Sequence, residues 1–406
     1  MRKITDRNSV SWRNLFLLAC CQAVGQAANT SMFAATALSV VTFYPNRDLA
    51  TLPVTLQHVG VMLSVFPAAL LMQRVGRSIG FRVGSVIGML GSVLVGLGLY
   101  HASFPLMCLG GLVHGYAVAN LQMYRFAATE LVPSSYTAKA ISWVTAGGVV
   151  AGIIGPSMVR WTHDQWVPTY LATYAGMVGI HVVVFTIMAF IRFPPATSSP
   201  APGGAVSSPV PPPRPLLEIA AQPLFIVAVV SGMAAFGTMS LLMGASPLAI
   251  VACGHAHTEA HWVIFLHVMG MFVPSFFTGS LIARFGVLQI MMLGIVIFLI
   301  GIAAGLAGLS EWNFRIALML NGIGWNFLFV GATTLVTRTY RPNERGKVQA
   351  LNDFLVFGTT ASASFLAGIL QERLGWFPLN WFSVALVATA ICAVGWQWTR
   401  RHATPA

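Results

Sequence analysis

The stretch PPATSSPAPGGAVSSPVPPPRP, residues 194–215, separates two long apolar regions of the chain. Pro, Ser, Gly and Ala dominate it, a composition typical of an extended or flexible linker. Six apolar segments precede the stretch and six follow it. We therefore predict an N-terminal half (1–193), a linker (194–215) and a C-terminal half (216–406).

Composition on both sides of the linker is that of a membrane protein. The 406 residues are 56% hydrophobic and 8% charged, with a mean hydropathy of +0.77. A membrane-crossing helix needs about 20 apolar residues. Twelve stretches meet that need, which predicts an all-α membrane protein: 14–44, 52–72, 80–101, 105–126, 136–160, 168–192, 219–251, 260–283, 287–308, 312–337, 346–371 and 376–399.

The net charge of +12 is explained by topology. With the N-terminus in the cytoplasm, eighteen of the 22 Lys and Arg residues lie in inner loops and tails, and Arg125, at the end of 105–126, is counted among them. This bias is typical of a bacterial inner membrane protein with both termini cytoplasmic. We therefore expect lipid surroundings and no nucleic-acid partner.

The two halves contain related loops. Gly76, in MQRVGR after the second segment, and Gly286, in IARFG after the eighth, are 210 residues apart, and Pro133 and Pro342 after the fourth and tenth are 209 apart. Matching offsets in two loops indicate a parallel internal repeat. The basic loop around Gly76 and the Gly155-Pro156 pair resemble the major facilitator superfamily, which implies two six-helix halves. Gln73 stands where that family usually has an aspartate.

Two motifs indicate what the protein binds. Met239 and Met243 share one helix face at i, i+4 spacing, as do His267 and Met271 in the next segment. Counted from the outer ends of their segments, all four lie about 10–18 Å deep, near the middle of the bilayer. Thioethers and imidazole without carboxylates favour Cu(I). Methionine packing, with His267 bonded to a neighbouring helix, is the alternative.

Further polar residues are candidates for binding. A cluster at the outer end of the same two segments predicts either a metal-capture point or a solvated loop: Cys253, His255, His257 and His261. Others within segments predict either a cavity lining or interhelical hydrogen bonds: Gln26, Asn29, His114, Asn120, Asn321 and Asn326. Asp353 lies within a segment, and we expect it to pair with Lys347 or Arg345.

The Met and His motifs with their flanks, including Pro247 and PSFFTG (274–279), resemble the CcoA-like bacterial copper importers. That resemblance implies copper uptake for haem–copper oxidase assembly, with Met239, Met243, His267 and Met271 as ligands. A related branch of that family carries riboflavin. The chain has no Gly-x-x-x-x-Gly-Lys-Ser/Thr loop and no nucleophile constellation, so neither an ATP-driven pump nor an enzyme is expected.

We therefore expect a monomeric secondary transporter that imports copper as Cu(I) by alternating access. It would need no permanent cofactor and would deliver copper to an unidentified cytoplasmic acceptor. One alternative is a carrier of an organic solute such as riboflavin. The other is a copper sensor or assembly factor that binds the ion without moving it.

Overall fold

The computed structural model of the protein describes residues 11–46, 49–193 and 212–403, and its elements there are helical. Six long helices belong to the first half: α1 (Trp12–Val40), α2 (Leu52–Val75), α3 (Arg77–Tyr100), α4 (Phe104–Thr129), α5 (Thr137–Thr162, preceded by the 3-10 turn Ser134–Tyr136) and α6 (Leu171–Ala189). The second half contains α7 (Leu216–Ala220), α8 (Pro223–Ala252), α9 (His257–Phe272), α10 (Ser275–Phe285), α11 (Val287–Leu306), α12 (Glu311–Val336), α13 (Arg345–Leu374) and α14 (Trp376–Ala403).

These helices confirm the predicted all-α membrane fold. Within the described residues, eleven spans are long and apolar enough to cross a membrane, with α9 and α10 counted as one. Helix α1 is not among them, although its 29 residues reach about 43 Å. The hydropathy of α1 is lowered by polar side chains such as Gln22, Gln26 and Asn29. These side chains line the interior of the protein.

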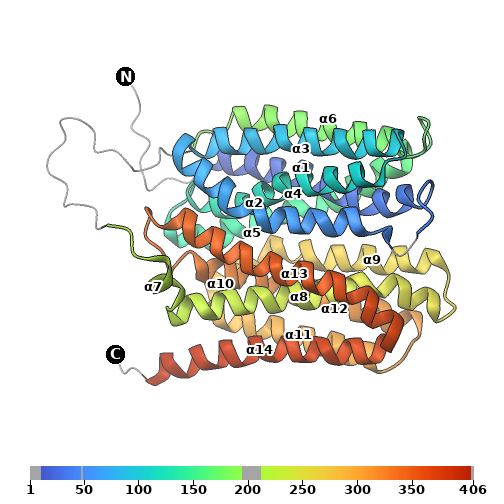
Figure 1. The fold of residues 1–406 in the computed structure, drawn as a ribbon. Helices are drawn as coiled ribbons and strands as arrows, with labels where there is room; N and C mark the ends of the chain where they lie inside the picture. The colour runs from blue at the N-terminus through green and yellow to red at the C-terminus, as the bar shows by residue number, and fades with distance from the viewer. Residues whose placement is uncertain (1–10, 47–48, 194–211, 404–406) are drawn as a thin grey trace.

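The long helices run side by side in two groups, α1–α6 and α8–α14 (Figure 1). Helix α1 begins and α14 ends at the same side of the molecule, which we call the terminal end; the other side is the far end. The groups meet where α2 packs against α13 and where α5 packs against α9 and α10. Residues 194–211 of the predicted linker lie outside the described part, so its boundaries remain a prediction.

The predicted repeat is visible at two glycines. Gly76 joins α2 to α3 with φ 84° and ψ 163°, and Gly286 joins α10 to α11 with φ 97° and ψ 155°. This positive-φ conformation is one that glycine adopts at little cost, whereas a side chain would be strained. The same residue type in the same conformation thus ends the second span of each half.

The second span of the C-terminal half is interrupted. We predicted one segment over 260–283, but α9 ends at Phe272 and α10 begins at Ser275. Pro274 lies between them and has no N–H to donate to the preceding turn, which explains the break. The hydroxyl of Thr278 donates to Pro274 O at 2.8 Å and adds a side-chain contact to the first turn of α10.

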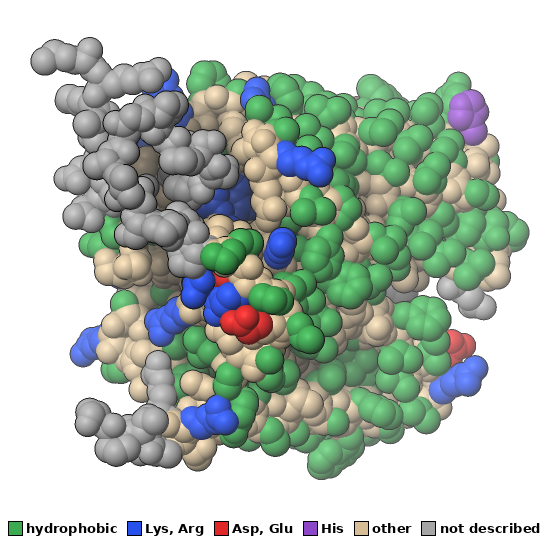
Figure 2. Space-filling model, turned by 60° about the vertical axis from the view of Figure 1, so that its left-hand side comes forward, with side chains coloured by type: hydrophobic (Ala, Val, Ile, Leu, Met, Phe, Trp, Pro, Cys, Tyr) green, Lys and Arg blue, Asp and Glu red, His purple; other side chains and the backbone are tan. Residues whose placement is uncertain are grey.

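The outer surface matches a lipid environment. On the face shown in Figure 2, hydrophobic side chains cover most of the body, whereas Lys and Arg gather toward the terminal end. Large apolar side chains on the outside of α2 and α3 are half exposed, among them Leu63, Leu70, Val86 and Leu90. In water such an apolar surface would drive aggregation, whereas in a bilayer it faces the lipid chains.

Candidate functional site

A cavity of about 500 Å³ lies between the two halves. Helices α1, α2, α4 and α5 form one wall, and α8, α9, α12 and α13 form the other. Helices α3, α6, α11 and α14 contribute no lining residue, because they pack on the outside of these eight. The cavity extends from Arg125, close to the terminal end, to side chains in the far half of the helices: Phe33, His58, Pro247 and Ser364.

The wall from the N-terminal half is rich in amides. Five Gln and Asn side chains line it: Gln22, Gln26, Asn29, Gln57 and Gln122. Gln57 is only 1% exposed, and its Nε2 donates to Asn29 Oδ1 at 2.5 Å. Its carbonyl oxygen has no hydrogen-bond partner in the described part of the chain. Buried amide groups normally have partners, so this oxygen is an exception within the wall.

The wall from the C-terminal half is aromatic. Trp325 and Phe329, one turn apart on α12, stack with their ring centroids 4.6 Å apart and planes at 19°. Phe236 on α8 meets both rings edge-on, and Phe272 on α9 meets Trp325 in the same way. Edge-to-face and offset-stacked contacts are the favourable geometries for aromatic rings. This half therefore offers a rigid aromatic surface to a ligand.

An ion pair between the halves lies at the floor of the cavity. Nη2 of Arg125, on α4, donates to Oδ1 of Asp353, on α13, at 2.5 Å, and both side chains are buried. The guanidinium also lies 4.7 Å from the ring centre of Phe126 and 4.8 Å from that of Phe329. Two expectations are thereby wrong: Asp353 does not pair with Lys347 or Arg345, and Arg125 is not in a loop. Asp353 pairs with the guanidinium that α4 places beside it, 228 residues away.

Further polar contacts join the halves at the terminal end. Glu130 accepts from Arg77 at 2.8 Å and pairs with Arg345 of α13 at 3.1 Å, and Arg77 also donates to Gln349. Nearby, the backbone N–H of Gly279 donates to the hydroxyl of Ser142 at 2.8 Å. The terminal end is therefore closed by contacts from both halves, next to the position of Gln73.

The predicted metal ligands separate into two environments. Met239, Met243 and Met271 all line the cavity. His267 is fully buried and is not among the lining residues; its Nδ1 lies 2.8 Å from Leu318 O on α12, and its Nε2 has no partner among the described residues. Three thioethers thus share the cavity, whereas the imidazole lies at the contact between α9 and α12.

Of the cluster predicted at the far end, His255 is engaged in another contact. Cys253 is exposed, and Nε2 of His255 lies 2.7 Å from Leu309 O. Glu259 pairs with Arg315, whose hydrogen bond lowers the pKa of that carboxyl. The side chains of His257 and His261 lie outside the described residues. Within the described part, no group of three or more His, Cys, Asp or Glu side chains could hold a metal ion.

The predicted polar lining is distributed over three places. Gln26 and Asn29 line the central cavity. Asn326 instead bridges helices, donating to Met271 O at 2.6 Å and accepting from Thr278 at 2.7 Å. Asn321 is buried in α12 and does not line the cavity. His114 and Asn120 line a separate pocket within the N-terminal half.

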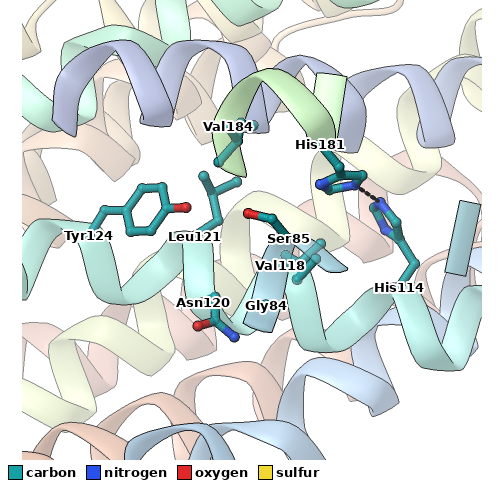
Figure 3. Close-up of a pocket in the computed structure, with 11 residues that line it drawn as sticks. Gly84, Ser85, His114, Val118, Asn120, Leu121, Tyr124, His181 and Val184 are labelled. Carbon is teal, nitrogen blue, oxygen red and sulfur yellow. Dashed lines mark hydrogen bonds between the residues drawn. The ribbon is translucent and has the colours of Figure 1, made fainter. Parts of the chain in front are cut away.

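That separate pocket has a volume of about 20 Å³ (Figure 3). The imidazoles of His114 on α4 and His181 on α6 face each other there, with their Nε2 atoms 3.1 Å apart. Tyr124 and Ser85 line the same pocket. Its size suits about one water molecule, which excludes a transported solute.

Several lining residues were missed by sequence reasoning. Gln57 and His58 escaped because their segment is otherwise apolar, and Trp325, Phe329 and Phe236 are common in any membrane helix. A signal did exist for Gln57, since a buried amide within a span is costly unless it has a partner or a ligand.

Two helical bundles about a closed-end central cavity, with buried polar contacts between them, define a membrane carrier of the secondary transporter class. The family model described as Major Facilitator Superfamily matches residues 15–251 and 234–406. The chain therefore belongs to the major facilitator superfamily, and it is a transporter and not an enzyme.

Individual proteins agree with that assignment. The riboflavin transporter RfnT of Brucella anthropi is 38% identical over 381 residues, which cover 93% of this chain and 94% of RfnT. The proton:xylose symporter XylE superposes with a TM-score of 0.77 at 13% identity, covering 95% of each chain. A bacterial homologue of the iron transporter ferroportin superposes with a TM-score of 0.73 at 13% identity, covering 96% of this chain and 100% of that one.

The prediction of copper import is wrong. A relative that matches nearly the whole chain at 38% identity is a riboflavin transporter, and this finding also removes support for a CcoA-like importer and for a role in oxidase assembly. The physical reason is that methionines at i, i+4 spacing serve equally well as the apolar wall of a solute cavity. Here they adjoin aromatic rings in the lining.

Proposed function

We propose that this protein carries an uncharged organic solute of the riboflavin type across the bacterial inner membrane by alternating access. The similarity to RfnT over nearly the full length of both chains carries this proposal. The cavity supports it, because about 500 Å³ falls within the usual range of small-molecule sites, roughly 300–1,000 Å³.

The lining suits such a solute. Riboflavin has a planar aromatic ring system, amide-like groups on one edge and a chain of hydroxyls. The aromatic wall matches the ring system, and amides such as Gln26 and Asn29 match the polar groups. Met239, Met243 and Met271 would complete the apolar surface, since thioethers pack well against aromatic rings. Arg125 is the one Lys, Arg, Asp or Glu in the described lining, and its charge is balanced by Asp353.

The closed terminal end favours uptake. The excess of Lys and Arg on that side favours a cytoplasmic position for both termini. The cavity then reaches toward the periplasm, so this conformation is ready to receive solute from outside. Release would follow when the halves rock apart at the contacts of Arg77, Glu130 and Arg345.

Uptake of radiolabelled riboflavin by cells that lack other riboflavin transport tests this function. Expression of the protein should raise uptake well above that of cells carrying an empty vector. Ser364 lines the cavity, so Ser364→Phe should abolish the gain by filling it. Ser362, on the same helix, is exposed and does not line the cavity, so Ser362→Phe is the matched control and should retain uptake. Wild-type uptake equal to that of the empty vector, at normal protein level, would overturn the proposal.

A further inference from the structure

One face of α1 presents three amide side chains to the cavity near the middle of the helix: Gln22, Gln26 and Asn29. We propose that this face binds the polyhydroxyl chain of the substrate, while the aromatic wall of the other half holds the planar ring. This inference rests on the proposed function and deepens it, because it names the residues that recognise the chain and requires a substrate with several hydroxyls beside a flat ring.

The spacing of the three amides follows from the geometry of the helix. They stand at positions i, i+4 and i+7 of α1, which lie on one face of an α-helix. From the first to the third, this row extends about 10 Å along the helix axis. Because all three line the same cavity, a chain that lies along α1 meets them one after another.

The amides of Gln22 and Gln26 are free to bind a ligand. Neither side chain makes a hydrogen bond within the described part of the chain, and their polar atoms, unlike Oε1 of Gln57, are not buried. Asn29 is held in place, since its Oδ1 accepts from Gln57 Nε2 at 2.5 Å. The amide nitrogen of Asn29 remains available as a donor. The face therefore combines two free carboxamides with one that is fixed in orientation.

The same residues do not serve as contacts between helices. An amide with that role has partners on neighbouring helices, as Asn326 has in Thr278 and Met271 O. Gln22 and Gln26 have no such partner among the described residues. Polar side chains inside a membrane span are costly, and those that face a cavity mark the path of a substrate. A carboxamide donates and accepts, as a hydroxyl does, so a chain of hydroxyls is a matching ligand.

The opposite wall differs in chemistry. Within the described residues, the lining from the C-terminal half contains no Asn or Gln, and its largest side chains are aromatic: Phe236, Phe272, Trp325, Phe329 and Phe357. The two walls therefore suit two different parts of one molecule. A simple sugar would leave the aromatic wall unused, and a flat ring without hydroxyls would leave the amides of α1 without ligand partners.

Binding of two flavins with the same ring to the purified full-length protein tests this assignment, with quenching of flavin fluorescence as the signal. Riboflavin carries the hydroxyl chain, whereas lumiflavin has a methyl group in its place. The wild type should bind riboflavin about 10- to 100-fold more tightly, as expected for about two additional hydrogen bonds. Equal affinity for the two flavins would overturn the inference. This measurement does not depend on any variant folding.

Two variants assign the preference to α1. Gln22→Leu and Gln26→Leu should each weaken riboflavin binding about 3- to 10-fold, because leucine cannot form the hydrogen bond. Both should leave the affinity for lumiflavin near its wild-type value, since lumiflavin lacks the hydroxyls that these amides contact. Gln289→Leu, at an exposed position on α11, is the matched control and should bind both flavins as the wild type does.

Two results with these variants would overturn the role of α1. One is an unchanged affinity for riboflavin in both variants. The other is an equal weakening for riboflavin and lumiflavin, because the substitutions would then act on the ring or on the shape of the cavity and not on the hydroxyl chain.

Failure of the proposed function gives a different result. If the wild type neither binds nor takes up riboflavin, the substrate is wrong and the assignment of its chain falls with it. If the wild type takes up riboflavin and binds lumiflavin equally well, the function stands and only the recognition of the chain by α1 is refuted.

Discussion

The pairing of Arg125 with Asp353 shows how single residues hold the two halves together. Both groups are buried at the floor of the cavity, where an unpaired charge is strongly unfavourable. The aromatic rings of Phe126 and Phe329 cover the guanidinium. The pair therefore favours the conformation in which α4 and α13 are close together.

Asp353→Asn should destabilise the protein by about 3–5 kcal/mol, because it leaves the buried guanidinium without a counter-charge. The double variant Arg125→Gln/Asp353→Asn should recover part of that loss, since it removes both charges. Thermal unfolding of the purified protein in detergent measures both effects. Arg373→Gln, at an exposed position on α13, is the control and should stay near wild type. A double variant no more stable than Asp353→Asn would contradict the role of the ion pair.

Single residues also mark the limit of sequence reasoning. The i, i+4 spacing places His267 and Met271 on one face of α9, but that face is wide enough to touch both α12 and the cavity. Which neighbour each side chain meets depends on packing between helices distant in sequence. The same limit applies to Asp353, because the local search found Lys347 and Arg345 and could not reach α4.

At the scale of elements, hydropathy predicted the helices well. Most predicted ends lie within a few residues of the observed ones, because the need to bury about 20 apolar residues is local information. The break at Pro274 and the short helix α7 were missed. Both features depend on hydrogen bonds. Hydropathy averaged over a stretch of sequence contains no information on hydrogen bonds.

The segment before α7 is fastened to the α12–α13 loop by one carboxylate. Glu344 accepts from the Arg214 backbone N–H and Nε at 2.9 Å each and from Nη2 at 2.7 Å. The backbone N–H of Arg341 donates to the same carboxylate at 2.9 Å. This contact anchors the C-terminal end of the predicted linker to the second half.

Acid should release that anchor. The hydrogen bond from Arg214 lowers the pKa of Glu344 from 4.5 to about 2. Because the folded-state pKa is lowered, the contact stabilises the protein above about pH 4.5, and this stabilisation is lost as the pH falls toward 2. The difference in unfolding temperature between wild type and Glu344→Gln should therefore be constant near neutral pH and shrink below pH 4.5. Glu372→Gln, at an exposed site, is the control. A difference that does not change with pH would contradict the assignment.

At the scale of the whole molecule, the fold follows from the sequence more directly than the cargo does. Twelve apolar segments, a central linker and two glycines 210 residues apart are enough to predict a duplicated carrier. The cargo depends on which side chains meet across the cavity, and the same methionines suit a soft metal or an aromatic ring. Similarity over the whole chain to a riboflavin transporter overturned the copper prediction that four matched positions had favoured.

Closure at one end and a cavity reaching the other predict different access to two serines. Ser364 lines the cavity toward the far end, whereas Ser142 is 1% exposed and bonded to Gly279 at the closed terminal end. In a background without the five native cysteines, Ser364→Cys should react with a membrane-impermeant thiol reagent added to intact cells, and Ser142→Cys should not. Riboflavin should slow the first reaction by occupying the cavity.

Because the two substitutions are chemically identical, any difference between their reaction rates reports the place of each serine in the fold. If Ser142→Cys reacted faster than Ser364→Cys, the protein in the membrane would be open at the terminal end, and the far end could not be the side that receives the solute.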